Sequence, residues 1–174
     1  KKTLKAPEQR NVLIYGRRRV GKSELIKQAL TDLSDVATVY YECRQTSEAD
    51  NLESLSVLVA EALSFPPLAF TGIRELIEFL FAQAKDKNIT LVLDEYPYLR
   101  DAVKGLDSIL QTSIDAHRED SRLNIVLCGS YVEIMKSLIE HESPLYGRID
   151  LALELKPMDY FDAAKFYPAF SPED

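Results

Sequence analysis

Cysteine is scarce in this chain, with two residues, Cys43 and Cys128, among 174. Each lies in an apolar run that predicts a strand, and neither belongs to a set of residues with metal-ligand spacing. We therefore interpret both as small buried thiols. Such a low cysteine content argues against a secreted fold held together by disulfides and against a cysteine-based metal centre.

Long apolar runs are missing as well. No stretch of the chain approaches the roughly 20 apolar residues that a membrane-spanning helix needs, and the start of the chain lacks the pattern of a signal peptide. We therefore expect no contact with a membrane and a cytoplasmic location. There is also no internal repeat and no low-complexity segment, so the length and composition suit one globular domain.

Positive charge is in the minority, because 21 Lys and Arg residues stand against 28 Asp and Glu residues and leave a formal net charge of -7. This balance argues against broad, nonspecific binding to nucleic acid, although a local basic patch would still allow it. Three arginines are nevertheless adjacent in the stretch IYGRRRVGKSELI, residues 14–26. So much positive charge in one loop of an acidic chain predicts a strongly anionic ligand there.

Apolar runs rich in β-formers alternate with amphipathic segments of helical period along the chain, which is typical of an α/β protein. Because most of these runs are too apolar to have a solvent-facing side, they predict a parallel sheet covered by helices on both faces. The predicted strands are 11–16, 37–43, 88–95, 123–130 and 149–157, the last at an edge, and the predicted helices lie at about 25–33, 52–63, 73–84, 103–114, 131–140 and 158–167.

The basic loop has the pattern of a phosphate-binding loop. Residues 16–23, GRRRVGKS, match G-x-x-x-x-G-K-[ST] between a predicted strand and a predicted helix. The two glycines allow a tight turn whose N–H groups wrap a phosphate, and the start of the helix adds its positive end. Lys22 is expected to reach the β- and γ-phosphates, and the Ser23 hydroxyl to bind Mg²⁺. A glycine-rich turn with a chance Lys-Ser is the alternative, and the agreement of strand, loop and helix argues against it.

The complete predicted nucleotide-binding set is the loop and its neighbour, namely Gly16, Arg17, Arg18, Arg19, Val20, Gly21, Lys22, Ser23 and Glu24. Two interpretations of the three arginines stay open. One or more of them faces phosphate or a partner, or all three are solvated surface charge. The backbone and Lys22 carry the phosphate argument without them.

A second predicted half of the site follows the third strand. In LVLDEYPYL, an apolar run ends in Asp94 and Glu95, and the carboxyl ends of parallel strands are where ligands bind in open α/β sheets. We expect Asp94 to hold Mg²⁺, through water, and Glu95 to act as the general base that polarises the attacking water. The alternative is that both acids cap the next helix and face solvent, which the buried run before them argues against.

Two further residues are weaker candidates for catalysis. Ser130 ends the fourth strand, where it could sense the γ-phosphate, cap the following helix, or do both. Arg148 ends the loop SPLYGR, and a guanidinium there could stabilise charge on a transferred phosphoryl group, in its own chain or in a neighbouring subunit. The alternative for Arg148 is a surface ion pair with an acid.

These segments together resemble a known group. IYGRRRVGKSELI, LVLDEYPYL, LCGSYVEIM and SPLYGRIDLALELKPM are similar to the archaeal- and bacterial-type ATPases of the STAND class, within the AAA+-like superfamily of P-loop NTPases. The resemblance implies a three-layer P-loop NTPase sandwich with a five-stranded parallel sheet in the order 5-1-4-3-2. It also implies ATP as the nucleotide and ATP-driven switching as the activity.

The resulting hypothesis is an Mg²⁺-dependent ATPase that works as a molecular switch and is slow in isolation. A second hypothesis is a nucleotide-gated module that binds protein or DNA and has little hydrolysis of its own. A kinase of small acceptors is a third, which the adjacent Glu95 and the lack of an arginine-rich lid disfavour. Expected partners besides ATP are the protein's own C-terminal domains, a neighbouring subunit or DNA.

The two ends of the chain suggest that it is part of something longer. Residues 171–174, SPED, have the pattern of a helix start, with Ser171 as N-cap and Pro172 at the first helical position. The chain also begins at Lys1 rather than at Met. We therefore expect residues 1–174 to be a single P-loop ATPase domain cut from a longer protein, without the helical, winged-helix and nuclease-like regions that the resemblance implies.

Overall fold

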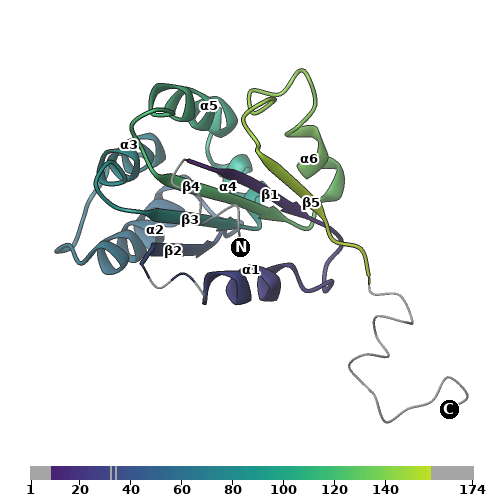
Figure 1. Ribbon diagram of the computed structural model, residues 1–174, viewed down its shortest axis with the longest axis horizontal. Coiled ribbons are helices and arrows are strands. Elements are labelled where there is room, and N and C mark those ends of the chain that lie inside the picture. The colour runs from purple at the N-terminus through teal and green to yellow at the C-terminus, as the bar shows by residue number, and fades with distance from the viewer. Residues whose placement is uncertain (1–8, 32, 34, 158–174) are drawn as a thin grey trace, which may run out of the picture.

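A sheet of five parallel strands forms the centre of the fold (Figure 1). The computed structural model describes residues 9–31, 33 and 35–157. The strands are β1 (Asn11–Tyr15), β2 (Ala37–Glu42), β3 (Ile89–Asp94), β4 (Leu123–Gly129) and β5 (Leu151–Glu154). Their order across the sheet is β2-β3-β4-β1-β5, which is the expected order 5-1-4-3-2 read from the other edge, and every neighbouring pair is parallel. The predicted fold class is confirmed.

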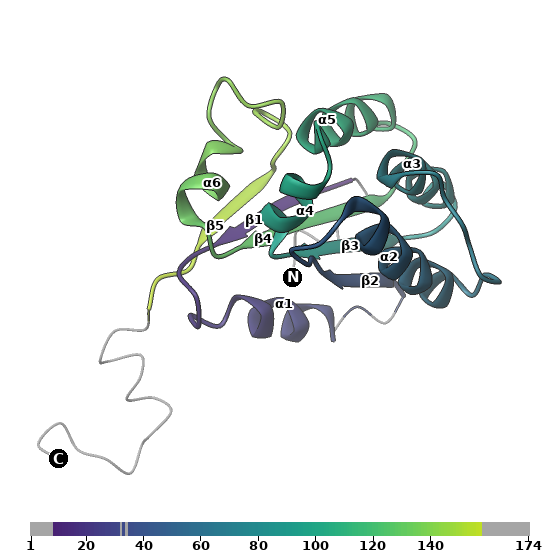
Figure 2. The same ribbon diagram turned by 180° about the vertical axis from the view of Figure 1, so that it is seen from behind.

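The helices cover the two faces of this sheet unequally. Helix α1 (Lys22–Leu30) lies alone on one face, as Figures 1 and 2 show from opposite sides. The other described helices lie on the opposite face, where their apolar side chains join the larger of the two core clusters. These helices are α2 (Glu48–Leu63), α3 (Ile73–Gln83), α4 (Tyr96–Ala102), α5 (Leu106–Ala116) and α6 (Val132–Ser137).

Burial along the strands follows from their place in the sheet. All residues of β3 and of β4 are buried, because these strands have a neighbour on each side and helices above and below. Strand β5 lies at an edge and is mostly exposed, as its partly alternating sequence predicts. The central strands therefore lie in the core of the fold, and the loops at their carboxyl ends begin from buried positions.

Helix α4 is an element that the sequence analysis missed. The helix after the third strand was expected to begin near residue 103, whereas the chain turns into α4 directly after Glu95 and only then enters α5. Pro97 lies in the first turn of α4, and proline there is a helix-start signal because its missing N–H would be unpaired anyway. The predicted helix at 131–140 is also shorter, ending at Ser137.

Two expectations lie outside the described residues, namely the helix at 158–167 and the helix start at 171–174. Within the described part of the chain, no helix is both long enough and apolar enough to cross a bilayer.

Candidate functional site

The phosphate-type loop and the acidic pair lie at the same end of the sheet, where the strands have their carboxyl ends. Residues 16–21 connect the end of β1 to the start of α1, and Asp94 is the last residue of β3. Strand β4 lies between these two strands, with Gly129 in register with Tyr15 of β1. The parallel topology therefore brings three segments that are far apart in the sequence to one place.

The two glycines of the loop serve different purposes. A Cβ on Gly16 would lie 2.1 Å from the carbonyl oxygen of Leu155, so the close approach of the chain just after β5 requires glycine. Gly21 has open space around it, but its φ of 89° at the N-cap of α1 is costly for a residue with a side chain. The expectation that both glycines serve approach to a ligand is therefore incomplete, because Gly16 is already needed for packing inside the fold.

Lys22 is buried inside the loop that it ends. Its Nζ donates to the backbone oxygens of Gly16 and Arg17, each at 3.0 Å. An ammonium group has three donors, and these bonds use two of them. The backbone oxygens of the loop therefore hold this positive charge in place at the start of α1.

Ser23 and Asp94 meet directly, although 71 positions separate them in the sequence. The Ser23 Oγ donates to Asp94 Oδ2 at 2.7 Å, and the Tyr40 hydroxyl donates to the same oxygen. The backbone N–H of Glu95 donates to Asp94 Oδ1 at 3.0 Å. This contact brings together the two residues that the sequence singles out as metal ligands.

The pKa of Asp94 results from opposing effects. Burial raises the pKa, but hydrogen bonds from Tyr40, Ser23 and Cys128 outweigh it and hold the pKa below the usual value. The carboxylate is therefore ionised at neutral pH in spite of its burial. Burial and the nearby Asp94 charge also raise the pKa of the Cys128 thiol. Both cysteines are buried free thiols, as the sequence analysis expected.

The donor set at this position fits magnesium. Mg²⁺ binds hard oxygen ligands and keeps several of its waters, so one hydroxyl and one carboxylate beside a phosphate site are sufficient protein ligands. Ser23 and Asp94 supply these two oxygens. The described residues contain no cluster of three or more His, Cys, Asp or Glu side chains that could hold another metal.

Glu95 and Ser130 also meet. The backbone N–H and the Oγ of Ser130 both donate to Glu95 Oε2, at 3.1 Å and 2.9 Å. Glu95 has a φ of 51°, in the left-handed region, and it begins α4 without a side-chain capping bond. Helix α6 likewise begins at Tyr131 without a side-chain cap. The capping alternatives for Glu95 and Ser130 are therefore not what these side chains do.

The three arginines of the loop differ from one another. All are exposed, as is Glu24, whereas Val20 is half-buried. Arg18 Nη2 donates to the Tyr98 hydroxyl at 3.1 Å, and its guanidinium lies 5.9 Å from the centre of the Tyr131 ring. Arg19 has a φ of 65°, an unusual conformation for a residue with a side chain.

Arg148 lies at the opposite end of the sheet from the loop, beside the amino end of β1. Its carbonyl oxygen accepts from the Asn11 side chain, and Asn11 is the first residue of β1, whereas the loop follows the last. The strand between them spans roughly 13 Å at about 3.3 Å per residue. The Arg148 guanidinium forms an ion pair with Asp115 of α5, with Nη2 2.7 Å from Oδ2. Within one chain, Arg148 is thus not part of the assembled site, and it forms the ion pair that the alternative describes.

Tyr40 is the site residue that sequence analysis missed. It lies on β2, beside β3, and its ring and Asp94 point to the face that α1 covers. The spacing of Tyr40 could have identified it. Tyr40 is two residues before Glu42, so the two side chains lie on the same face of β2, and Glu42 is paired with Asp94 across the sheet. Using that signal required the strand pairing, which the run YYEC does not itself specify.

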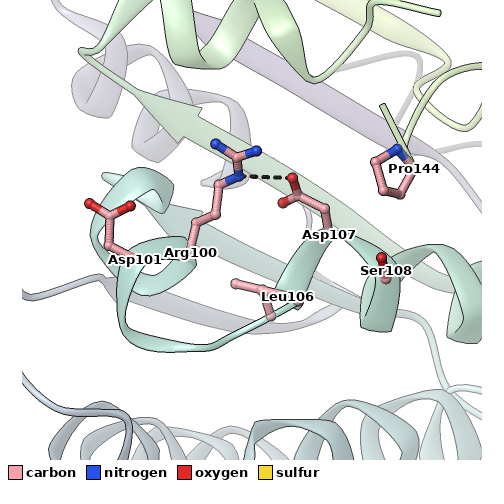
Figure 3. A pocket seen from close by; sticks show the side chains of 7 residues that line it. Arg100, Asp101, Leu106, Asp107, Ser108 and Pro144 are labelled. Carbon is pink, nitrogen blue, oxygen red and sulfur yellow. Dashed lines mark hydrogen bonds and ion pairs between the residues drawn. The ribbon is translucent and has the colours of Figure 1, made fainter. Parts of the chain in front are cut away.

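A polar pocket of about 350 Å³ lies away from this site, between α4, α5 and Pro144 (Figure 3). Arg100 extends across it from α4 and donates to Asp107 of α5, with Nε 2.8 Å from Oδ2. The buried Tyr96 hydroxyl donates to the other carboxylate oxygen of Asp107. These two bonds tie α4, the helix that follows Glu95, to α5.

Comparison with known proteins gives consistent matches. A family model described as an ATPase domain predominantly from Archaea matches residues 1–173. An uncharacterized protein of Methanocaldococcus jannaschii is 30% identical over 158 residues, which are 90% of this chain and 33% of that protein. The chain therefore spans about a third of the length of this curated relative.

Solved structures show the same fold. A Walker-type ATPase of Pyrococcus abyssi matches with a TM-score of 0.65 and 22% identity, over 97% of this chain and 54% of that one. The ORC2 protein of Aeropyrum pernix, in ADPNP-ADP complexes, matches with a TM-score of 0.61 and 17% identity, over 84% of this chain and 41% of that one. The chain thus covers 54% of the first solved structure and 41% of the second.

Proposed function

Because this chain belongs to the family of ATPase domains found predominantly in Archaea, we propose that it binds ATP with Mg²⁺ at the edge formed by β1, β3 and β4 and hydrolyses it. The observation that carries the proposal is the 2.7 Å contact between Ser23 and Asp94, which joins the phosphate-type loop to the acidic strand end. Lys22, held inside the loop, supplies the positive charge that a triphosphate needs.

The proposed reaction is the attack of a water oxygen on the terminal phosphorus. The bond from that phosphorus to the oxygen bridging to the β-phosphate breaks, ADP leaves with that electron pair, and Glu95 accepts the proton that the water loses. Lys22 and the loop N–H groups stabilise the charge on the phosphate oxygens. Ser23 and Asp94 would hold a bound Mg²⁺, which would supply Lewis-acid neutralisation of the charge on the phosphate oxygens.

The contact between Glu95 and Ser130 supports a switching role of the STAND type. In the structure Glu95 Oε2 accepts two hydrogen bonds from Ser130, so the base is tied to the end of β4. Orienting a water requires this carboxylate to turn toward the phosphate or to share its hydrogen bonds with the water. Ser130 would then report the state of the site to β4 and α6, and turnover of the isolated domain would be slow.

A structure with the same fold supports nucleotide as the ligand. The Aeropyrum pernix ORC2 protein, which shares the fold, was solved in complexes with ADPNP and ADP. Partners beyond nucleotide are also a proposal, because this chain is a third of the length of its curated relative. A neighbouring subunit, DNA or further domains of the same protein remain the proposed partners.

The test separates binding from turnover. We expect Lys22→Ala to lower the affinity for MgATP by about 100-fold or more, since it removes a charged hydrogen-bond donor to phosphate. We expect Glu95→Gln to keep binding and to lower the hydrolysis rate by about 100-fold or more, since it removes the base. Calorimetry measures the first and phosphate release the second, with the exposed Lys104→Ala as a charge-matched control.

Unchanged MgATP binding by the folded Lys22→Ala protein would refute the nucleotide site. If Glu95→Gln hydrolysed ATP as fast as the original chain, Glu95 would not be the base. Binding without hydrolysis in the original chain would instead favour the nucleotide-gated module over the ATPase.

A further inference from the structure

Three side chains from the three segments of the site meet at its rim. Arg18 comes from the loop, Tyr98 from α4 behind Glu95, and Tyr131 from the residue directly after Ser130. We call them the Arg18 cluster. The two tyrosine rings pack edge to face, with centres 5.9 Å apart, and their hydroxyl oxygens lie 3.5 Å apart. The sequence pattern of the loop does not specify either tyrosine.

The contacts in this cluster orient the arginine. Tyr98 accepts a hydrogen bond from Arg18 Nη2, and the Tyr131 ring lies beneath the guanidinium at a distance typical of a weak cation–π contact. A guanidinium has five N–H donors, so the bond to Tyr98 leaves most of them available to a ligand. The side chain is thus held in one direction at little cost to its capacity to bind an anion.

That direction is toward the side of the site where the proposed water attacks. Tyr98 lies one turn after Glu95, and its N–H donates to the Glu95 carbonyl. Tyr131 is adjacent to Ser130, which donates twice to the Glu95 carboxylate. Arg18 therefore extends from the loop toward the two segments that carry Glu95 and Ser130. By contrast, the exposed side chains of Arg17 and Arg19 make no hydrogen bond or ion pair within the described part of the chain.

We propose that Arg18 is a contact for the terminal phosphate, supplied by this chain itself, and that Tyr98 and Tyr131 are positioning residues that hold its guanidinium beside Glu95. The inference rests on the proposed nucleotide site and adds to it the feature that distinguishes a triphosphate from a diphosphate. It also gives one of the three adjacent arginines a role that its two neighbours lack.

The first test compares two arginines of the same loop. We expect Arg18→Ala to weaken MgATP binding about tenfold more than MgADP binding, because a charged hydrogen bond to the terminal phosphate is lost. Arg17→Ala removes the same charge from the next position and is expected to weaken both nucleotides by equal factors. Arg19 is a poorer control, because its positive φ would confound the comparison. Calorimetric titration with each nucleotide gives the two ratios.

The second test asks whether Tyr98 acts through Arg18. Tyr98→Phe removes only the hydroxyl, and we expect it to reduce the preference for MgATP over MgADP in the original chain. In the Arg18→Ala background the same change should have no further effect, because the group that it positions is gone. A merely structural tyrosine would give the same loss in both backgrounds.

The third test uses a spectroscopic signal. The chain contains no tryptophan, so Tyr131→Trp introduces a single tryptophan, whose fluorescence can be excited apart from that of the tyrosines. We expect its emission to change with MgATP but not with MgADP, and the change to vanish when Arg18→Ala is added. Tryptophan also presents an aromatic face, so the cation–π contact with the Arg18 guanidinium is kept.

The possible outcomes separate this inference from the function on which it rests. The ratio of the affinity for MgATP to that for MgADP could be the same in Arg18→Ala, in Arg17→Ala and in the original chain, with binding still dependent on Lys22. That result would overturn the role of Arg18 and leave the nucleotide site intact. Absence of MgATP binding to the original chain would overturn both.

Discussion

At the residue scale, the site depends on side chains whose partners come from distant segments. The most buried example is Asp94, which is only 3% exposed yet stays ionised because Ser23, Tyr40 and Cys128 donate hydrogen bonds to it. The motif identifies Ser23 and Asp94 from their residue types and positions. It does not identify Tyr40, because a tyrosine in an apolar strand is ordinarily part of the core.

We expect Tyr40→Phe to destabilise the fold at neutral pH by about 1.5–3 kcal/mol, the usual contribution of a hydrogen bond to a charged group. The lowered pKa of Asp94 means that its ionised form stabilises the fold above the unfolded-state pKa of about 3.9. That contribution is lost as the pH falls through the folded-state pKa. Losing the Tyr40 hydroxyl raises the pKa of Asp94, so the difference in stability should narrow at pH 3.

Urea unfolding at pH 7 and pH 3 measures this difference. Tyr41→Phe is the matched control, because Tyr41 is the next residue on the same strand and its hydroxyl donates to the neutral Asn51 amide oxygen. Its cost should not narrow in the same pH window. An equal cost of Tyr40→Phe at both pH values would contradict the proposed link to the Asp94 charge.

At the element scale, α4 matters most, because it carries Glu95 at its start and Tyr98 in its first turn. The helix is short, and short helices gain most of their stability from tertiary contacts. Asp107 of α5 accepts from both Tyr96 and Arg100, so one carboxylate fixes two points along α4. We infer that this pair of bonds keeps the base in place.

We expect Asp107→Asn to cost about 1 kcal/mol of stability, because it keeps an oxygen acceptor but removes the charge that pairs with the partly exposed Arg100. Asp101→Asn, on the exposed side of the same pocket, should cost little. Urea unfolding of both variants checks the comparison. Equal stability of the two variants would show that the bonds across the pocket do not hold α4.

Prediction of the elements succeeded where the signal was long and periodic. All the strands were located within one to three residues at each end, and the stripe of α3 was recognised because its apolar residues recur at helical spacing and are buried. Helix α4 was missed because its seven residues span less than two helical turns and show no repeated apolar spacing. The end of α6 was misjudged for a similar reason, since a short helix ends where its packing ends.

At the scale of the whole molecule, the carboxyl ends and the amino ends of the parallel strands carry different functional residues. The loop, the acidic pair and Ser130 lie at the carboxyl edge, and Arg148 lies at the amino edge with Asp115. A guanidinium so placed reaches a phosphate only if a second copy of the chain brings it there. The choice between action within one chain and action between chains therefore becomes a question of assembly.

We expect Arg148→Ala to leave the hydrolysis rate per chain unchanged in dilute solution, because the residue is outside the site of its own chain. A difference should appear only at concentrations where the rate per chain of the original protein rises through association. Phosphate release over a concentration series measures this, and Asp115→Asn controls for loss of the exposed ion pair. Slower hydrolysis by the folded variant at high dilution would contradict the placement of Arg148.

Local sequence patterns were enough to identify the phosphate-type loop, the acids after the third strand and the alternation of strands and helices. These follow from local spacing, since a tight loop, a buried strand and an amphipathic helix each leave a pattern within about ten residues. Local patterns do not show which side chains meet in the folded chain: Tyr40 with Asp94, Tyr98 and Tyr131 with Arg18, and Arg148 with Asp115. Those contacts join segments tens of residues apart, so strand order and helix packing determine them rather than any local pattern.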